Sequence, residues 1–211
     1  MLRAASDLTL TRSGNDLVAR ITNQGGHKLP SGYAEGRRMW LNVRFFAGKN
    51  LLAERGHYDH TLATLTTVDT KVYEAVMGLD AAMATLTGLP AGASFHLAVN
   101  NTIVKDNRIP PRGFANAAFE AGQAQPVAAS YADGQYWDDT SFAIPVGATH
   151  AIVSVFHQTS SREYMEFLRD ENTTDNRGQI AYDEWVAAGK SKPVLMDRRT
   201  FTFGTKVLPS R

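Results

Sequence analysis

One histidine of this chain lies in a stiff loop, where its side chain could have several chemical roles. His27 lies in residues 26–33 (GHKLPSGY), where glycines let the backbone approach another surface and Pro30 restricts it. An imidazole in such a loop can ligate a metal or an iron cofactor, or it can hydrogen-bond the backbone of its own loop. The sequence leaves both interpretations of His27 open.

Two arginines follow this loop almost at once. Arg37 and Arg38 open the run RRMWLNV. A guanidinium group pairs with a carboxylate through two parallel hydrogen bonds, so these side chains could bind a carboxylate-bearing ligand. The alternative is an internal salt bridge with Glu35 or Glu54. Trp40, in the same run, is predicted to anchor the core.

A second distinctive segment carries an acid, two prolines and a base. Residues 105–114 (KDNRIPPRGF) should be extended, which makes Asp106 and Arg108 project the same way. This pattern predicts either a docking edge or a rigid crossover that the two side chains tie down.

Aromatic residues between positions 131 and 137 suggest a binding surface of another kind. Tyr131, Tyr136 and Trp137 are candidates for an exposed aromatic group, with Tyr136 and Trp137 as interaction residues. Such a group would suit a carbohydrate-binding or protein-binding β-sandwich.

Histidines elsewhere allow a different class of function, a histidine-dependent metal-binding protein or metalloenzyme. His57 and His60 could share a transition metal in a turn, whereas on a strand they would face opposite ways. His96 and His150 lie in strand-like patterns and could meet across a sheet.

An oxygen-rich loop is a candidate calcium site. Asp170, Asn172 and Asp175 offer the carboxylate and amide oxygens that calcium prefers. Their spacing departs from that of an EF-hand. The alternative is a solvated polar loop.

Known catalytic templates are missing from the sequence. It contains no Gly-x-Ser-x-Gly, no phosphate-binding loop, no His-Glu-x-x-His and no Rossmann glycine pattern. The adjacent acids at 138–139 and 183–184 are more typical of solvated carboxylates than of an acid–base pair. We expect no catalysis, although the sequence alone leaves an enzymatic role open.

Composition excludes several partners and cofactors. The 211 residues are 43% hydrophobic and 20% charged, and their formal net charge is +1. This balance predicts no nucleic-acid partner, and no apolar run approaches the roughly 18 residues of a membrane span. With no cysteine, the chain cannot hold a covalent c-type haem. Residues 1–7 lack the pattern of a signal peptide.

The elements that must position these residues are mostly strands. A hairpin is expected over residues 8–22, because apolar and polar residues alternate on both sides of a turn. Further strands are expected at residues 40–46, 51–55, 72–76, 94–99, 149–157 and 201–203. Short strands separated by turn residues predict a β-sandwich or barrel.

Helical patterns are few and gather near the end of the chain. Ser160 and Glu163 have the spacing of a capping box, which begins a predicted helix at about residue 160. A second helix is expected from about 180 to 188, ending at Gly189. A short helix is also expected near residues 80–86, whereas residues 115–132 are interpreted as a surface excursion.

Three segments, in this order, resemble a known family. Residues 26–43, residues 106–114 (DNRIPPRGF) and residues 157–168 (HQTSSREYMEFL) are similar to motifs of the β-sandwich domain that follows the haem-binding region in bacterial multihaem c-type cytochromes. The resemblance runs from about residue 17 to about residue 196. One departure is His157, where that family is expected to carry a tyrosine.

The resemblance implies a fold, a partner and a location. It implies an immunoglobulin-like or jelly-roll antiparallel β-sandwich, one domain over residues 1–211 with a helical insertion at about 160–190. The chain would be a non-catalytic accessory domain of an electron-transfer system, packed against a multihaem c-type cytochrome domain or subunit in the periplasm or outside the cell. His27, Arg37 and Arg38 would then face a haem that the partner carries.

Overall fold

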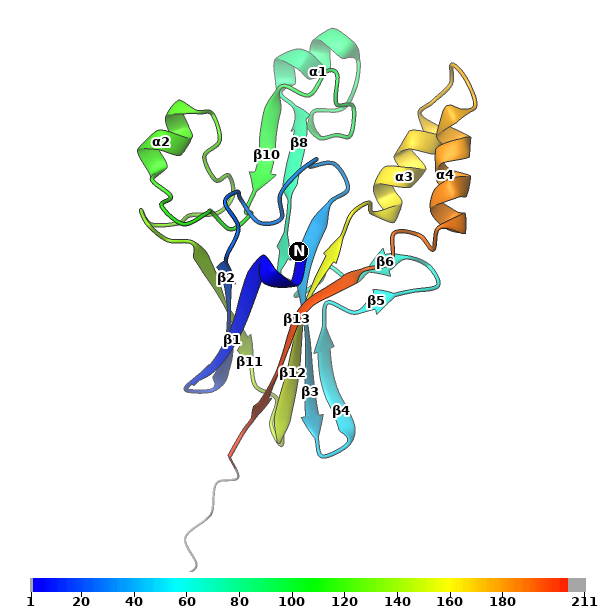
Figure 1. The fold of residues 1–211 in the computed structure, drawn as a ribbon. Helices are drawn as coiled ribbons and strands as arrows, with labels where there is room; N and C mark the ends of the chain where they lie inside the picture. The colour runs from blue at the N-terminus through cyan, green and yellow to red at the C-terminus, as the bar shows by residue number, and fades with distance from the viewer. Residues whose placement is uncertain (1, 205–211) are drawn as a thin grey trace, which may run out of the picture.

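The computed structural model describes residues 2–204, and its main body is a β-sandwich (Figure 1). The strands of this body are β1 Ser6–Ser13, β2 Asp16–Asn23, β3 Arg38–Ala47, β4 Asn50–Arg55, β7 Val72–Tyr73, β11 Trp137–Ala143, β12 His150–Gln158 and β13 Val194–Thr202. One sheet has the order β1-β2-β11, and the other has the order β13-β12-β3-β4 with β7 beside β3. Every pairing within these two sheets is antiparallel, which confirms the predicted fold class.

The core lies between the inner faces of these two sheets. In β12 the alternating residues Ala151, Val153 and Val155 are fully buried, as their spacing predicts. The first sheet contributes Leu8, Leu17, Ala19, Ile21 and Phe142 to this core. The second sheet, to which β12 belongs, also contributes Met39, Leu41, Val43, Phe45 and Met196. Burial of each large aliphatic side chain contributes about 1.5–3 kcal/mol, so this layer is the main source of stability.

The two sheets are also joined along one edge by polar contacts. The backbone N–H of Leu8 in β1 donates to Asp197 of β13 at 2.9 Å. Arg199 of β13 in turn donates to the backbone carbonyl of Leu8 at 3.2 Å. These bonds use backbone groups of β1 that would otherwise form an open edge.

A smaller sheet extends from one end of the sandwich. It has the order β10-β8-β9 and consists of β8 Ala75–Leu79, β9 Gly92–Ala93 and β10 Thr102–Asp106. The predicted short helix forms as α1 Ala81–Thr87, whose first turn is capped by the Asp80 side chain. Figure 1 shows α1 at the tip of this extension, and α2 Asn116–Ala121 beside it.

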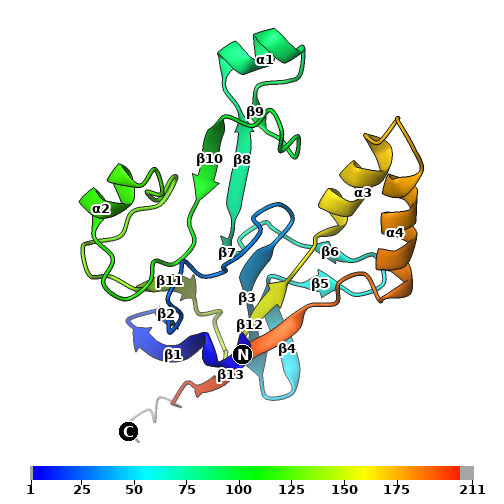
Figure 2. The ribbon, with the colours of Figure 1, turned by 45° about the horizontal axis from the view of Figure 1, so that its top comes forward.

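Two helices near the C-terminal end form the predicted insertion. They are α3 Arg162–Asp170 and α4 Arg177–Ala187, and Figure 2 shows them side by side above the short strands β5 Tyr58–Asp59 and β6 Thr64–Leu65. A 3-10 turn, Leu2–Ala4, begins the described chain. Within residues 2–204 no helix has the length and apolarity needed to cross a bilayer.

The cap of α3 differs from the predicted capping box by one residue. Ser161, not Ser160, accepts a hydrogen bond from the backbone of Tyr164. Glu163 therefore does not lie at the third helical position, and its side chain lies 3.6 Å from the guanidinium of Arg38.

The loop before β3 passes close to α3 at Gly36. Gly36 has a φ of +69°, and a Cβ at this position would lie 2.6 Å from the Cβ of Tyr164.

The strand predicted at residues 94–99 is wrong. Local hydrogen bonds fold this segment into turns instead: the backbone N–H of His96 donates to the Ser94 hydroxyl, and Asn100 donates to the Ser94 carbonyl. Ser and Asn side chains compete with sheet pairing in this way.

Two further expectations need correction. The run at residues 72–76 divides at Glu74 into β7 and β8, which belong to different sheets. The surface excursion at residues 115–132 contains α2, whose first N–H, that of Asn116, donates to Asp133 at 2.8 Å. Alanine favours a helix once its first turn has such a partner.

Candidate functional site

The two distinctive segments of the sequence meet in the structure. Leu29 and Ile109 exchange two backbone hydrogen bonds of 2.8 and 2.9 Å. The Asn23 side chain, fully buried, donates to the carbonyls of His27, Ile109 and Pro110 at 2.8–3.0 Å. The loop that carries His27 is thus fixed against the segment that carries Asp106 and Arg108.

A buried carboxylate joins the same two segments by charge. Asp106 accepts from Lys28 at 2.7 Å and from two nitrogens of Arg108 at 2.8 and 2.7 Å. The side chains of Asp106 and Lys28 are only 3% and 7% exposed. Burial alone would raise the pKa of Asp106, but the hydrogen bonds and charges of Arg108 and Lys28 outweigh it and lower that pKa. The expectation that Asp106 and Arg108 project the same way is confirmed.

A cavity of about 660 Å³ opens beside this charged group. It lies between the His27 loop, the end of β10 and α2. Figures 1 and 2 both show α2 next to β10 on one side of the molecule. Its walls include Gly26, His27, Lys28, Ser31, Gly32, Ile103, Asp106, Arg108, Pro111, Phe119, Gln123 and Ala124. His27 is exposed at the rim. Its backbone carbonyl accepts from Asn23 in bracing the loop, and within residues 2–204 its imidazole makes no hydrogen bond.

Neither of the two arginines after this loop lines the cavity beside His27. Arg37 donates to the Ser31 carbonyl at 2.6 Å and so braces the loop from within. Arg38 is buried and donates to Gln158 at 2.9 Å, with Glu163 at 3.6 Å. Both arginines line a separate cavity of about 260 Å³ rather than the one beside His27.

The internal partner of Arg38 differs from those expected. Neither Glu35 nor Glu54 pairs with it; Glu54 accepts instead from Asn42 at 2.7 Å. Trp40 anchors the core as predicted: it is fully buried and stacks between Tyr58 and Phe156.

The aromatic residues near position 136 do not form one exposed group. Tyr136 and Trp137 lie edge to face at 5.4 Å and are covered by the guanidinium groups of Arg112 and Arg20. Tyr131 is buried, and its hydroxyl donates to the Asn107 carbonyl at 2.9 Å. The expectation of an exposed surface with all three rings is therefore wrong at Tyr131.

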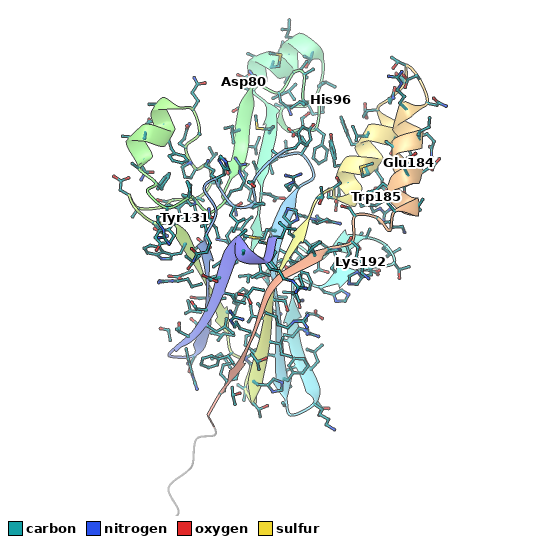
Figure 3. All side chains as sticks on the ribbon, viewed as in Figure 1. Asp80, His96, Tyr131, Glu184, Trp185 and Lys192 are labelled. Atoms are coloured by element: carbon teal, nitrogen blue, oxygen red, sulfur yellow. The ribbon has the colours of Figure 1, made fainter. Side chains whose placement is uncertain are left out.

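The histidines are dispersed. His57 lies 3.3 Å from Glu54, and the His60 ring packs edge-on against Tyr58. His96 packs on Phe167, far from Tyr131 in Figure 3. His150 packs on Phe46, so it does not meet His96 across a sheet. In the part of the chain that the structure describes, no three His, Asp or Glu side chains are grouped to hold a metal.

The oxygen-rich loop between α3 and α4 satisfies its own groups. Asp170 pairs with Arg169 at 2.6 Å. Asn172 donates to Asp175 at 2.9 Å, and Asp175 also accepts from the backbone of Arg177. These bonds lower the pKa of Asp170 and of Asp175. The side chains named as calcium ligands thus already have partners within the protein.

Two contributors to the cavity were not singled out from the sequence. Lys28 stands inside the quoted motif, and its burial follows from its place beside the paired Leu29, which no local pattern indicates. Phe119 lies in the segment interpreted from the sequence as a surface excursion. It belongs to α2, and its ring lies 5.7 Å from the Lys28 ammonium.

Of the adjacent acids at 138–139, Asp138 has a structural role. It accepts from the buried Tyr73 hydroxyl at 2.9 Å and pairs with Lys71 at 2.9 Å.

Comparison with known proteins gives one structural likeness. No protein-family model matches the chain. No curated protein matches its sequence. Among solved structures, a penta-heme cytochrome c552 from Thermochromatium tepidum superposes with a TM-score of 0.54 at 14% sequence identity. The match covers 96% of this chain but 40% of that cytochrome, so the chain spans about two fifths of its length and shares the fold of that part.

Proposed function

We propose that this chain is a non-catalytic domain of a multihaem c-type cytochrome system, packed against a region or subunit that carries the haems. Its role would be to cover the haem array, limit the access of water to it and present a rigid surface to a redox partner. Burial and hydrogen bonding around a haem are two of the means by which a protein sets its potential. The proposal places the chain in the periplasm or outside the cell.

The observation that carries the proposal is the extent of the structural match. Nearly the whole chain, 96%, aligns with two fifths of a penta-haem cytochrome, so a region of the same fold occurs in that protein. This chain has no cysteine and cannot attach such haems itself. A sandwich of this fold beside haems on another region accounts for both facts.

Within this proposal, the face that carries His27 turns toward the haems. The loop is held rigidly at Leu29 and Asn23 while the imidazole of His27 stays exposed. A rigid loop with a free imidazole can approach a cofactor with little loss of conformational freedom. Arg37 supports this face by bracing the loop at Ser31, and Arg38 by tying the start of β3 to Gln158 and Glu163.

The proposal is tested by reconstitution. A multihaem c-type cytochrome region or subunit from the same source is produced separately, and its haem potentials are measured by potentiometric titration with and without this chain. We expect a complex and a shift in at least one haem potential, because docking excludes water from a haem edge. Unchanged potentials and no complex would contradict the proposal.

His27→Ala is the variant that tests the orientation of the domain. His27 is exposed, so its removal should leave the unfolding curve unchanged. We expect weaker binding to the haem-bearing polypeptide or an altered haem spectrum in the complex. His150→Ala, a histidine on the outer surface of the opposite sheet, is the matched control. Equal effects of the two variants would remove His27 from the interface.

A further inference from the structure

We propose that the cavity beside the His27 loop binds the propionate carboxylates of a haem in the partner, through Lys28 and Arg108. This inference rests on the proposed function and names the chemical group that the cavity accepts. It is independent of any ligation by His27.

The charge of the cavity supports an anionic ligand. Among the lining residues, all of them in the described part of the chain, Asp106 is the sole acid, whereas Lys28 and Arg108 are both cations. One carboxylate shared by two cations leaves a formal surplus of one positive charge. Lys28 is 7% exposed, so this surplus is poorly screened by water and attracts an anion more strongly than a surface lysine would.

Hydrogen-bond donors remain free after the internal pairing. Arg108 uses Nε and Nη2 on Asp106, and its Nη1 makes no hydrogen bond within residues 2–204. The Lys28 ammonium has three N–H groups, of which Asp106 takes one. A second carboxylate can therefore be bound without breaking the first pair.

The remaining walls select the body to which the carboxylate is attached. Ile103, Pro111 and the half-buried ring of Phe119 give the cavity an apolar wall beside the charges, with the Phe119 ring 5.7 Å from the Lys28 ammonium. Gly26 stands at the opening with no other atom within 4 Å of where a Cβ would lie, so a flat group can approach the backbone closely. A propionate carried by a macrocycle fits both walls, whereas a small free anion would leave the apolar wall uncovered.

The test uses a soluble haem whose axial positions are already filled. The probe is the bis-cyanide complex of ferric protoporphyrin IX, added to the whole chain and followed by quenching of tryptophan fluorescence. The same complex with both propionates converted to amides is the matched ligand control. We expect the amide to bind about tenfold or more weakly, because charge-assisted bonds to both cations are lost.

Variants assign the effect to the cavity. Arg108→Gln should weaken binding of the acid by about tenfold but leave binding of the amide unchanged, while Arg112→Gln, an exposed arginine of the same segment outside the cavity, should change neither. If Arg108→Gln does not fold, the comparison of acid and amide on the wild-type chain still decides the question.

Each outcome supports or overturns the inference. Equal affinity for the acid and the amide would overturn it even if the chain still binds its haem-bearing partner, and the proposed function would then stand alone. Binding of succinate that displaces the haem acid at similar concentration would overturn the propionate assignment in favour of a free carboxylate. Selective binding of the acid supports the assignment of the cavity to haem propionates. If the reconstituted complex does not form, the proposed function fails, and with it the source of the haem, while the preference of the cavity for the haem carboxylates is still measured.

Discussion

At the scale of single residues, Asp106 holds the candidate site together. Its carboxylate, only 3% exposed, bonds to Lys28 on one segment and to Arg108 on the other. A buried charge without a partner is expensive, so the three side chains depend on one another. The three charged side chains therefore stabilise the fold, and because two cations share one carboxylate they also give the candidate site one excess positive charge.

Asp106→Asn should be strongly destabilising, because it leaves two cations near each other without their shared anion. We expect a loss of about 3–5 kcal/mol in the free energy of unfolding, measured by urea titration at pH 7. Asp139→Asn is the control, since Asp139 pairs with Arg20 at 2.7 Å but is 40% exposed. Its loss should stay below about 1 kcal/mol. Similar losses in both variants would contradict the structural role of Asp106.

His157 should make stability depend on acid pH. Burial, and next the charge of Arg37, lower the pKa of His157 from 6.5 to about 4. As the pH falls below 6.5 the unfolded chain takes up a proton that the folded chain refuses until about pH 4. The stabilisation present above pH 6.5 is thus lost between these values, by up to about 3 kcal/mol.

The measurement compares urea unfolding of the wild type and His157→Phe from pH 7 to pH 4. The carboxylates contribute to both curves, so the difference between the curves isolates the histidine. We expect the variant to lose less stability over this range. Two parallel curves would show that the imidazole is not buried in its neutral form.

At the scale of elements, α3 depends on the cap that the structure assigns to it. The Ser161 hydroxyl accepts from the Tyr164 backbone, whereas Ser160 caps nothing there. Ser161→Ala should cost about 0.5–2 kcal/mol in unfolding free energy, and Ser160→Ala should cost much less. Circular dichroism during thermal unfolding distinguishes the two. A larger loss for Ser160→Ala would restore the capping box expected from the sequence.

Elements with a local signal could be predicted from the sequence, and elements decided by long-range contacts could not. The hairpin β1–β2, the strand β12 and the helices α3 and α4 follow from alternation and amphipathic spacing. The division between β7 and β8 at Glu74 depends on a distant residue, because the backbone N–H of Glu74 donates to the side chain of Asn107.

Only part of the candidate site can be predicted from the sequence, for the same reason. From the sequence, His27 and the pair of Asp106 and Arg108 are separate features. Their meeting depends on the bridge between Leu29 and Ile109 and on the burial of Lys28, and nothing within either segment encodes that contact. Arg37 and Arg38 follow His27 by ten and eleven residues in the sequence, yet they line another cavity.

At the scale of the whole molecule, the sandwich acts as a rigid base for its loops. The paired sheets bury an extensive apolar layer, while the His27 loop, β10 and α2 gather beyond the end of the first sheet (Figure 2). Functional groups on loops that a rigid scaffold fixes are a common arrangement in proteins. Part of a penta-haem cytochrome has the same fold, and this likeness supports the proposal made above that the chain packs against haems on another region.

The most direct test of this account is the native mass of the complex that the chain forms in its own cells. The chain would be purified from the source under gentle conditions and weighed by native mass spectrometry, with covalent haem counted on each polypeptide. The account predicts a defined complex, or a longer product of the same gene, in which several haems are attached to Cys-x-x-Cys-His motifs outside these 211 residues. A chain isolated without any haem-bearing partner, or one that turns over a substrate alone, would contradict it.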